Sequence, residues 1–430
     1  MSANFATRLL EEHAAFAATL PRAQGEASER RHALGKASAA GLPPLRDDAW
    51  RYSNLRAVEK ARLAPATPLT PEQALASASR LLPQPLPDFA RLVFVNGQLL
   101  RPLSGEPADL VGARLELSSG HTEGVLAPTA DERFAWLNAA FATDIARLAV
   151  SGTLQLEVLY LTVPTPNAGA TYPRLEVAVG NHARLVLVER HLGGGGPAAL
   201  NAPSVQIEVG AAGVAEHYRL QASAPDAVIM DSLLATLAAG ARYELTQLSW
   251  GAASARHSTR IQLSGEGASL LVNGMSLSDA NRVLDTAIQV EHVARRTSSE
   301  QTLRAIANGR SRIAFNSRVE VASSAGGADS RQSLKGLLGS PGAEVNLRPQ
   351  LEISTDEVKA SHGATTGALD DNMLFYLLSR GLDPDTARKL LEWAFIEDVM
   401  SRIRIPALRR QVELASVDCL GNATALEALR

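Results

Sequence analysis

A histidine stands among small residues near the C-terminal end of the chain. The stretch KASHGATTG, residues 359–367, places His362 between Ser361 and Gly363, and these neighbours leave its imidazole free to reach a ligand or a partner. Imidazole is a common metal ligand. Because LEIS precedes the stretch and LDDNMLFYLLSRG follows it, we expect His362 at a strand-to-helix junction. Alternatively, the small residues only form a tight turn in which His362 packs, since one imidazole without fixed neighbours does not define a site.

Other residues that could carry chemistry are scattered. We expect His182, His217, His257 and His292 to be surface, strand-face or buried structural residues rather than ligands. Cys419 is the only cysteine, so the chain alone can form neither an internal disulfide nor an all-cysteine zinc or iron–sulfur cage. The nearest approach to a Walker A motif, HALGKAS, lacks the first glycine and the Ser or Thr after the lysine, which argues against nucleotide hydrolysis by that route.

The composition is that of a soluble globular protein. Of 430 residues, 46% are hydrophobic and 20% charged, and the formal net charge is −3. No basic domain or polybasic run indicates nucleic-acid binding. No window of eighteen uncharged apolar residues predicts a membrane span, and charged residues interrupt any secretory signal at the N-terminus. We therefore expect a cytoplasmic protein that binds neither nucleic acid nor membrane.

The chain divides into three regions that differ in their expected secondary structure. Residues 1–146 are predicted to form a mostly helical domain, with helix over 4–40 and 131–148 and a β-hairpin at 91–100 around Asn96-Gly97. Residues 366–430 are predicted to be helical. There Asp370 is expected to cap one helix that Gly381 ends, and Asp383 to cap the next.

Residues 147–365 form a strand-rich repeat. Strand, small-residue turn and strand recur in RLEVAVGNHARLVLVER, VQIEVGAAGVAEHYRL, LATLAAGARYELTQL and IQLSGEGASLLVNG, with turn glycines at Gly180, Gly210 and Gly240. Such a pair cannot bury its apolar face alone, so stacking of successive units would build a β-helix. An antiparallel sandwich, whose hairpins also recur at short spacing, fits the pattern as well.

A long C-terminal stretch resembles the SufB/SufD family of iron–sulfur cluster assembly proteins. The pieces that carry the resemblance are PQLEI at 349–353, SHGAT at 361–365, FYL at 375–377 and SRG at 379–381. DDAWRYSNL at 47–55 is similar to the family's N-terminal acidic-Trp-[KR]-Tyr-[ST]-Asn-Leu stretch. The resemblance covers nearly the whole chain in the right order.

Within that family the chain most resembles the SufD branch. SufB-like chains carry a cysteine shortly before the P-x-[IL]-E strand, whereas here the loop contains Ser340 and Pro341 and no thiol. SufD-like chains often read K-C-S-H-G-A-T, and Ala360 replaces that cysteine here. This departure excludes a thiol role at position 360 and shifts attention to His362, which matches the family's histidine.

The resemblance implies a right-handed parallel β-helix core flanked by N- and C-terminal helical domains. It implies a non-enzymatic subunit that pairs with a SufB-like paralogue through the β-helices and binds a SufC-like ABC-type ATPase through its C-terminal helices. His362 is then a candidate iron or cluster ligand at the SufB interface, and any iron–sulfur cluster would be transient and shared with the partner. We expect Phe375, Tyr376 and Trp393 to contact the ATPase. The isolated chain could also form a homodimer.

Two alternatives remain. β-Helices also host enzymes that act on polysaccharides, which need clustered charged residues on one face of the solenoid. Because Glu176, Glu208 and Glu244 lie at different offsets from their turn glycines, we expect no stacked acidic ladder. The other alternative is a self-sufficient SufB-like scaffold, against which the lack of thiols argues.

Overall fold

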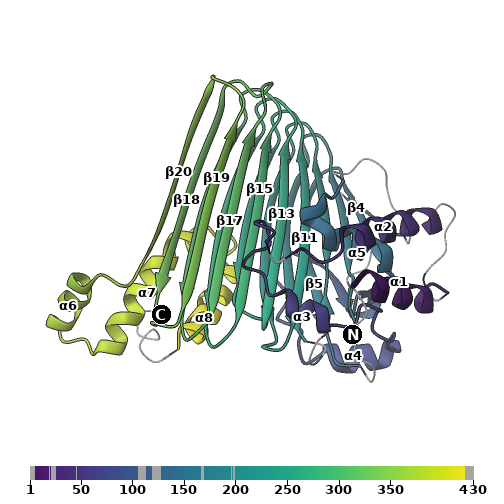
Figure 1. Cartoon of the computed structure of the whole chain (residues 1–430), viewed down its shortest axis with the longest axis horizontal. Coiled ribbons are helices and arrows are strands. Elements are labelled where there is room, and N and C mark those ends of the chain that lie inside the picture. The colour runs from purple at the N-terminus through teal and green to yellow at the C-terminus, as the bar shows by residue number, and fades with distance from the viewer. Residues whose placement is uncertain are drawn as a thin grey trace.

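The molecule is built around two mainly parallel sheets that face each other and share a continuous apolar interior (Figure 1). The computed structural model describes residues 5–18, 20, 26–44, 46–104, 113–118, 127–165, 169–194, 196 and 199–421. The predicted fold class, a mainly β chain with a parallel β-solenoid core and helices at both ends, is confirmed.

Each sheet runs the length of the solenoid. Sheet I contains, in spatial order, β2 (Gln98–Leu99), β1 (Ala90–Val95), β5 (Thr153–Thr162), β7 (Arg184–Gly193), β10 (Val214–Ser223), β12 (Arg242–Ser249), β14 (Ser269–Ser278), β16 (Ser298–Ala307), β18 (Ala328–Leu338) and β20 (Val358–Gly367). Sheet II contains β19 (Glu344–Ile353), β17 (Arg312–Val321), β15 (Val283–His292), β13 (Ser254–Leu263), β11 (Val228–Leu237), β9 (Ser204–Val209), β6 (Arg174–Val179), β4 (Ile145–Val150) and β3 (Ala113–Ser118), with β8 (Leu200–Asn201) paired to β11.

Consecutive strands of the repeat lie in opposite sheets. In the first unit β6 belongs to sheet II and β7 to sheet I, and each pairs in parallel with its counterpart in the next unit, β9 and β10. The turn between them is therefore the corner of a coil and not a hairpin. This topology excludes the antiparallel sandwich.

The corners stack on one another through a left-handed residue in each turn. His182, Ala212 and Gly240 have φ values of 59°, 53° and 63°, and their N–H groups donate to carbonyls of the next coil. Gly240 therefore aligns with His182 and Ala212, and not with Gly180 and Gly210 as the glycine spacing predicted. Only one of the three positions uses the residue that adopts positive φ without a steric cost.

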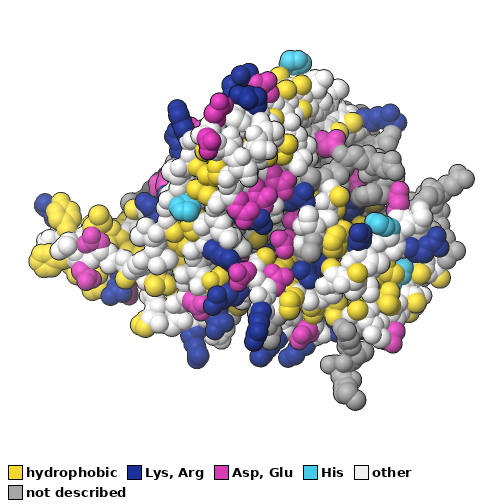
Figure 2. All heavy atoms as spheres, turned by 45° about the horizontal axis from the view of Figure 1, so that its top comes forward, with side chains coloured by type: hydrophobic (Ala, Val, Ile, Leu, Met, Phe, Trp, Pro, Cys, Tyr) yellow, Lys and Arg dark blue, Asp and Glu magenta, His cyan; other side chains and the backbone are white. Residues whose placement is uncertain are grey.

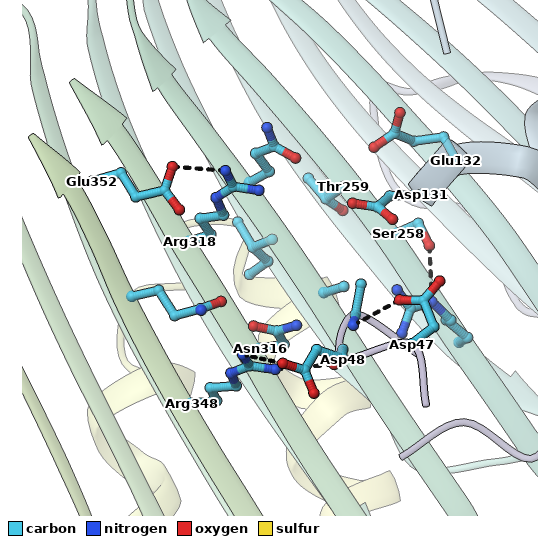
Figure 3. A pocket seen from close by; sticks show the side chains of 16 residues that line it. Asp47, Asp48, Asp131, Glu132, Ser258, Thr259, Asn316, Arg318, Arg348 and Glu352 are labelled. Carbon is cyan, nitrogen blue, oxygen red and sulfur yellow. Dashed lines mark hydrogen bonds and ion pairs between the residues drawn. The ribbon is translucent and has the colours of Figure 1, made fainter. Parts of the chain in front are cut away.

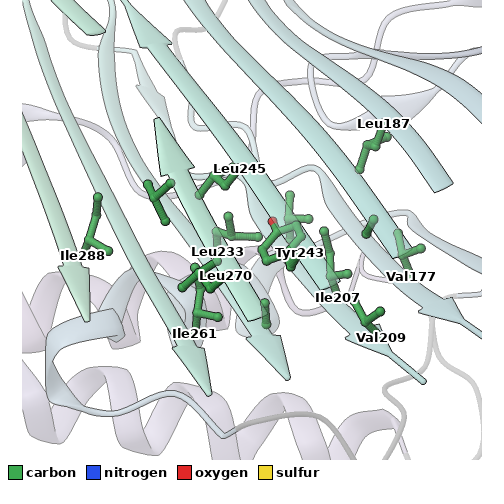
Figure 4. Packing of buried hydrophobic residues seen from close by; sticks show 14 of the residues in the cluster. Val177, Leu187, Ile207, Val209, Leu233, Tyr243, Leu245, Ile261, Leu270 and Ile288 are labelled. Carbon is green, nitrogen blue, oxygen red and sulfur yellow. The ribbon is translucent and has the colours of Figure 1, made fainter. Parts of the chain in front are cut away.

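Side chains that alternate inward along the strands fill the solenoid. Val177, Ile207, Leu233 and Tyr243 lie in one cluster of buried residues that extends through successive coils (Figure 4). Because paired residues in parallel strands point to the same face, a residue's position in the register decides whether its side chain is inside or outside.

Helices accompany the first coils. They are α1 (Phe5–Phe16), α2 (Glu26–Ala40), α3 (Leu55–Lys60), α4 (Pro71–Ala78) and α5 (Arg133–Phe141). Residues 4, 19 and 21–25 of the helix predicted over 4–40 lie outside the described residues. The predicted hairpin around Asn96-Gly97 is confirmed, but the helix predicted over 131–148 ends at Phe141 and β4 begins at Ile145. Strands β1 and β3 from this segment join the two sheets, and the division at residue 146 stays a prediction.

Three helices follow the last strand: α6 (Asp371–Ser379), α7 (Pro384–Met400) and α8 (Pro406–Leu420). Asp370 caps α6 and Asp383 caps α7 through side-chain hydrogen bonds to backbone N–H groups, as predicted, and Gly381 has φ 89°. Buried residues of α7 and α8 pack against the outer face of sheet I, whereas α6 projects away from it (Figure 1).

Candidate functional site at the open end of the solenoid

The solenoid ends in two strands whose outer edges pair with no other strand of the described residues. β20 is the last strand of sheet I and β19 the last of sheet II. From Lys359 to Gly367 every residue of β20 is exposed, whereas most residues of the interior strands are buried. An exposed edge of this kind presents unpaired N–H and C=O groups to which another strand can add. The open end is therefore a place where the fold is incomplete.

His362 lies in the middle of β20 and not at a strand-to-helix turn. The predicted junction is wrong because LEIS ends β19, and the whole stretch KASHGATTG belongs to a further strand. The connection to α6 comes only at residues 368–370. The small residues around the histidine thus do not serve a turn.

The register places His362 on the inner face of the solenoid wall. It pairs with Gln332 of β18, which is only 4% exposed and faces the interior. Ala360 and Ala364 share this face with His362, because side chains alternate along a strand. His362 itself is exposed, since none of the described residues forms a further coil over it. The imidazole therefore stands between two small side chains on the uncovered inner face.

The predicted ATPase contacts separate into an exposed pair and a half-buried residue. Phe375 and Tyr376 on α6 are 71% and 56% exposed, and Met373 on the same helix is 59% exposed. Figure 2 shows the hydrophobic side chains of this helix gathered at the left-hand tip of the molecule. Trp393 on α7 instead packs against the buried cluster between the helices and sheet I. Large apolar side chains this exposed are unusual on a surface that contacts only water.

A buried charged cluster inside the solenoid was not foreseen. Arg219 on β10 is at its centre, with Nε 2.6 Å from Glu189 Oε2 and a terminal nitrogen 3.5 Å from Asp231 Oδ1. His217 Nε2 lies 3.1 Å from the same Glu189 oxygen, and His257 hydrogen-bonds to Asp231. His217 and His257, expected to be structural or strand-face residues, are thus inward-facing members of an ion-pair network.

The charged groups of this cluster compensate one another. Burial by itself would raise the pKa of Asp231, but Arg219 and His257 outweigh it and lower the pKa to about 2. Glu189 likewise has a pKa below its usual range, because Arg219 and His217 outweigh the effect of its burial. Burial lowers the pKa of His217. The charges of Glu189, Arg219 and Asp231 are thus compensated by partners within the chain.

The expectation that no acidic ladder exists is wrong. Glu291, Glu320 and Glu352 pair in register on the outer face of β15, β17 and β19. Arginines interleave with them: Arg260 lies 2.7 Å from Glu291, and Arg318 lies 2.9 Å from Glu320 and 2.7 Å from Glu352. Burial, with the neighbouring glutamates, raises the pKa of Glu320, and Arg318 opposes this. The ladder is neutralised by arginine and is not a free row of carboxylates.

A polar cleft of about 320 Å³ lies beside the ladder, between the outer face of sheet II and the N-terminal segment (Figure 3). Arg348 is ion-paired to Asp48 at 3.2 Å, and Arg318 to Glu352. Arg256, also in the lining, stacks on Trp50 with 3.7 Å between the guanidinium carbon and the ring centroid. The contacts of Asp48 and Trp50 attach the segment containing DDAWRYSNL to the solenoid wall.

The donors for a metal or cluster are few. Among the described residues, no three His, Cys, Asp or Glu side chains gather as a metal site. Cys419 lies on α8, and burial raises the pKa of its thiol to about 11, which keeps it protonated. The open end offers one imidazole from this chain, so a cluster bound there would need ligands from another chain. In the part of the chain that the structure describes, no helix has the length and apolar character to cross a membrane.

Comparisons with known proteins agree on one family. The family described as "SUF system FeS cluster assembly, SufBD core domain" matches residues 162–395. The iron–sulfur cluster assembly protein SufD of Escherichia coli is 28% identical over 383 residues, which cover 86% of this chain and 88% of that protein. An iron–sulfur cluster assembly SufBD family protein of Synechocystis is 26% identical over 404 residues, covering 89% of this chain and 88% of the relative. These relatives are named for assembly and not for an enzymatic activity.

Proposed function

The chain belongs to the SufBD family of iron–sulfur cluster assembly proteins, and from this premise we propose that it is a SufD-like, non-enzymatic scaffold subunit. In this role it pairs with a SufB-like paralogue and binds a SufC-like ATPase. The observation that carries the proposal is the open end of the solenoid, where an exposed strand presents His362 on its inner face.

Pairing with a paralogue would complete the open end. A second solenoid with its own terminal strands can add its edges to β19 and β20, so that both sheets continue across the junction. The exposed inner face of β20 would then become buried, as it is in every earlier coil. A second copy of this chain could occupy the same edge when the paralogue is absent.

A shared site would explain the single imidazole. Iron–sulfur clusters are held mainly by thiolates, with histidine as an occasional replacement. In the proposed complex His362 supplies one ligand to iron or to a nascent cluster, and the paralogue supplies thiolates. The cluster is cargo in transit and not a resident cofactor of this chain.

The exposed face of α6 is the proposed ATPase contact. Phe375, Met373 and Tyr376 are the three most exposed large apolar side chains among the described residues, and all three lie on this helix. Trp393 would support this face from α7, because it packs at the base of the helical region. The absence of a Walker A motif fits an ATPase that is supplied by another chain.

The function of His362 is tested by co-expressing the chain with its paralogue and ATPase and measuring cluster assembly on the purified complex. His362→Ala should leave the mass of the complex unchanged and reduce cluster formation at least tenfold. His32→Ala, an exposed histidine on α2, is the matched control and should have no effect. Normal cluster assembly by an intact His362→Ala complex would refute the role of this residue.

The ATPase contact is tested separately. Phe375→Ser with Tyr376→Ser should weaken binding of the ATPase at least tenfold, measured by calorimetry, because anchors of this size dominate interface energies. Leu75→Ser on α4, where the side chain is 41% exposed, controls for loss of surface hydrophobicity. Unchanged affinity of the double variant would place the ATPase elsewhere.

A further inference from the structure

A short chain of polar side chains leads from the interior to the open end. Gln301 on β16 and Gln332 on β18 are in register on the inner face of sheet I. Ser317 on β17 reaches between them from sheet II. Its Oγ lies 2.6 Å from Gln301 Oε1, and Gln332 Nε2 lies 2.7 Å from the same Oγ and 3.0 Å from the carbonyl oxygen of Ser317.

The direction of these hydrogen bonds is determined by the chemistry of Ser317. A backbone carbonyl can only accept, so the Gln332 atom that faces it must be the amide nitrogen. The Ser317 hydroxyl donates to Gln301 Oε1 and accepts from Gln332 Nε2. The remaining atom, Gln332 Oε1, is a buried acceptor to which no donor among the described residues is hydrogen-bonded. Burial of such an atom is unfavourable unless a donor reaches it.

The next coil offers one donor in the same register. On sheet II the residue in register with Ser317 is Pro349, which has neither a side-chain donor nor a backbone N–H. On sheet I the residue in register with Gln332 is His362. Neighbouring strands lie about 4.8 Å apart, so an imidazole N–H on β20 is within reach of the Gln332 amide.

We propose that Gln332 is a positioning residue for His362. Its Oε1 accepts a hydrogen bond from one ring N–H of the neutral imidazole. This bond selects one tautomer and orients the ring, and it leaves the other ring nitrogen with its lone pair toward the open end. Histidines that bind metals commonly donate their second nitrogen to an oxygen in this way. The purpose of the arrangement rests on the proposed function of His362, but the hydrogen bond itself does not.

The test is the tautomeric state of His362 in the full-length chain at neutral pH. With ¹⁵N-labelled histidine, and with His362→Ala to identify its signals, the two ring nitrogens should show the well-separated shifts of a single tautomer. Gln332→Met, which keeps the length of the side chain and removes the acceptor, should move both shifts toward the values of exchanging tautomers. Gln350→Met, on the outward-facing side of β19, is the matched control and should change neither.

Two outcomes would overturn the proposal. The first is exchanging tautomers of His362 in the unmodified chain. This outcome needs no variant, so the test does not depend on the folding of Gln332→Met. Shifts that stay the same in a folded Gln332→Met chain would mean that another donor, such as Gln301 Nε2, reaches the Gln332 oxygen. If the tautomer is fixed but His362→Ala assembles clusters normally, the positioning stands and the proposed function of His362 falls.

Discussion

Two histidines lie in the same column of the inner face of sheet I, but they differ in burial and in their contacts. The column runs through Leu187, His217, Leu245, Val272, Gln301, Gln332 and His362. His217 is 1% exposed, with Nδ1 2.8 Å from the Tyr243 hydroxyl and Nε2 3.1 Å from Glu189. His362 is exposed, and within the part of the chain that the structure describes no strand pairs with the outer edge of β20.

The difference shows that the position of a coil, and not the residue type, decides what an inward-facing histidine can do. His217 has coils on both sides, and both ring nitrogens are already used within the chain. A ligand could reach it only by disrupting the buried charges. His362 has a coil on one side only. Gln332 in that coil can accept a hydrogen bond from one ring nitrogen, while the other ring nitrogen faces a partner. The following predictions test this contrast between the closed interior and the open end.

The largest expected effect is the loss of the central cation of the closed cluster. Arg219→Met leaves Glu189 and Asp231 as buried carboxylates without their main compensating charge. Breaking a buried ion pair by removing one partner costs about 3–5 kcal/mol. We expect a loss of this size in the free energy of unfolding, measured by urea denaturation of the full chain.

The control for this variant lies near the open end. Arg331 on β18 is ion-paired to Asp329 at 3.2 Å, but its side chain is 65% exposed. Arg331→Met should change stability by less than about 1 kcal/mol, because exposed ion pairs contribute little. Equal losses for the two arginines would show that the interior cluster is not closed to solvent, and the contrast would fail.

The second prediction concerns acid. Burial, followed by the charge of Arg219, lowers the pKa of His191 to about 4, whereas the pKa of a histidine in the unfolded chain is about 6.5. Between these values the unfolded chain binds a proton that the folded chain does not, so stability falls as the pH falls from about 6.5 to about 4. For this residue the full loss is about 3 kcal/mol.

His191→Gln removes the proton-binding group and should flatten this part of the stability profile, measured by urea denaturation at a series of pH values. His292 should contribute in the same direction, since burial lowers the pKa of its imidazole also to about 4. An unchanged slope in His191→Gln would mean that His191 is accessible to water in the folded chain. The interior would then be less closed than its hydrogen bonds indicate.

The fold could be predicted largely because its elements are encoded locally. The strand-turn-strand repeat, the Asn96-Gly97 hairpin and the caps at Asp370 and Asp383 depend on residues close together in the sequence. The place of His362 could not be predicted in this way. KASHGATTG has few of the large β-branched residues that mark a strand, and it forms one because β18 provides a pairing edge.

The polar interior could not be predicted because it depends on register between distant strands. Glu189, Arg219 and Asp231 come from three different strands, and nothing in their local sequence shows that they meet. The acidic ladder of Glu291, Glu320 and Glu352 was missed for the same reason. Offsets counted from glycines in the first coils do not carry over to coils whose corners use other residues.

The smallest expected effect on stability comes from His362, and it is compared directly with that of His217 in the same column. His217→Ala should lower the free energy of unfolding by about 2–3 kcal/mol, since it leaves the Tyr243 hydroxyl and Glu189 each short of a buried partner. His362→Ala should cost less, about 1 kcal/mol, because the imidazole is exposed and its loss deprives only Gln332 Oε1 of the proposed donor, which water can replace at the open end. Both are measured by urea denaturation of the isolated chain, at a concentration where light scattering shows a monomer, since pairing through β20 would bury His362. A loss for His362→Ala in the monomer as large as that for His217→Ala would show that this histidine belongs to the packing of the last coil, and the open end would then be a structural terminus and not a site kept free for a partner.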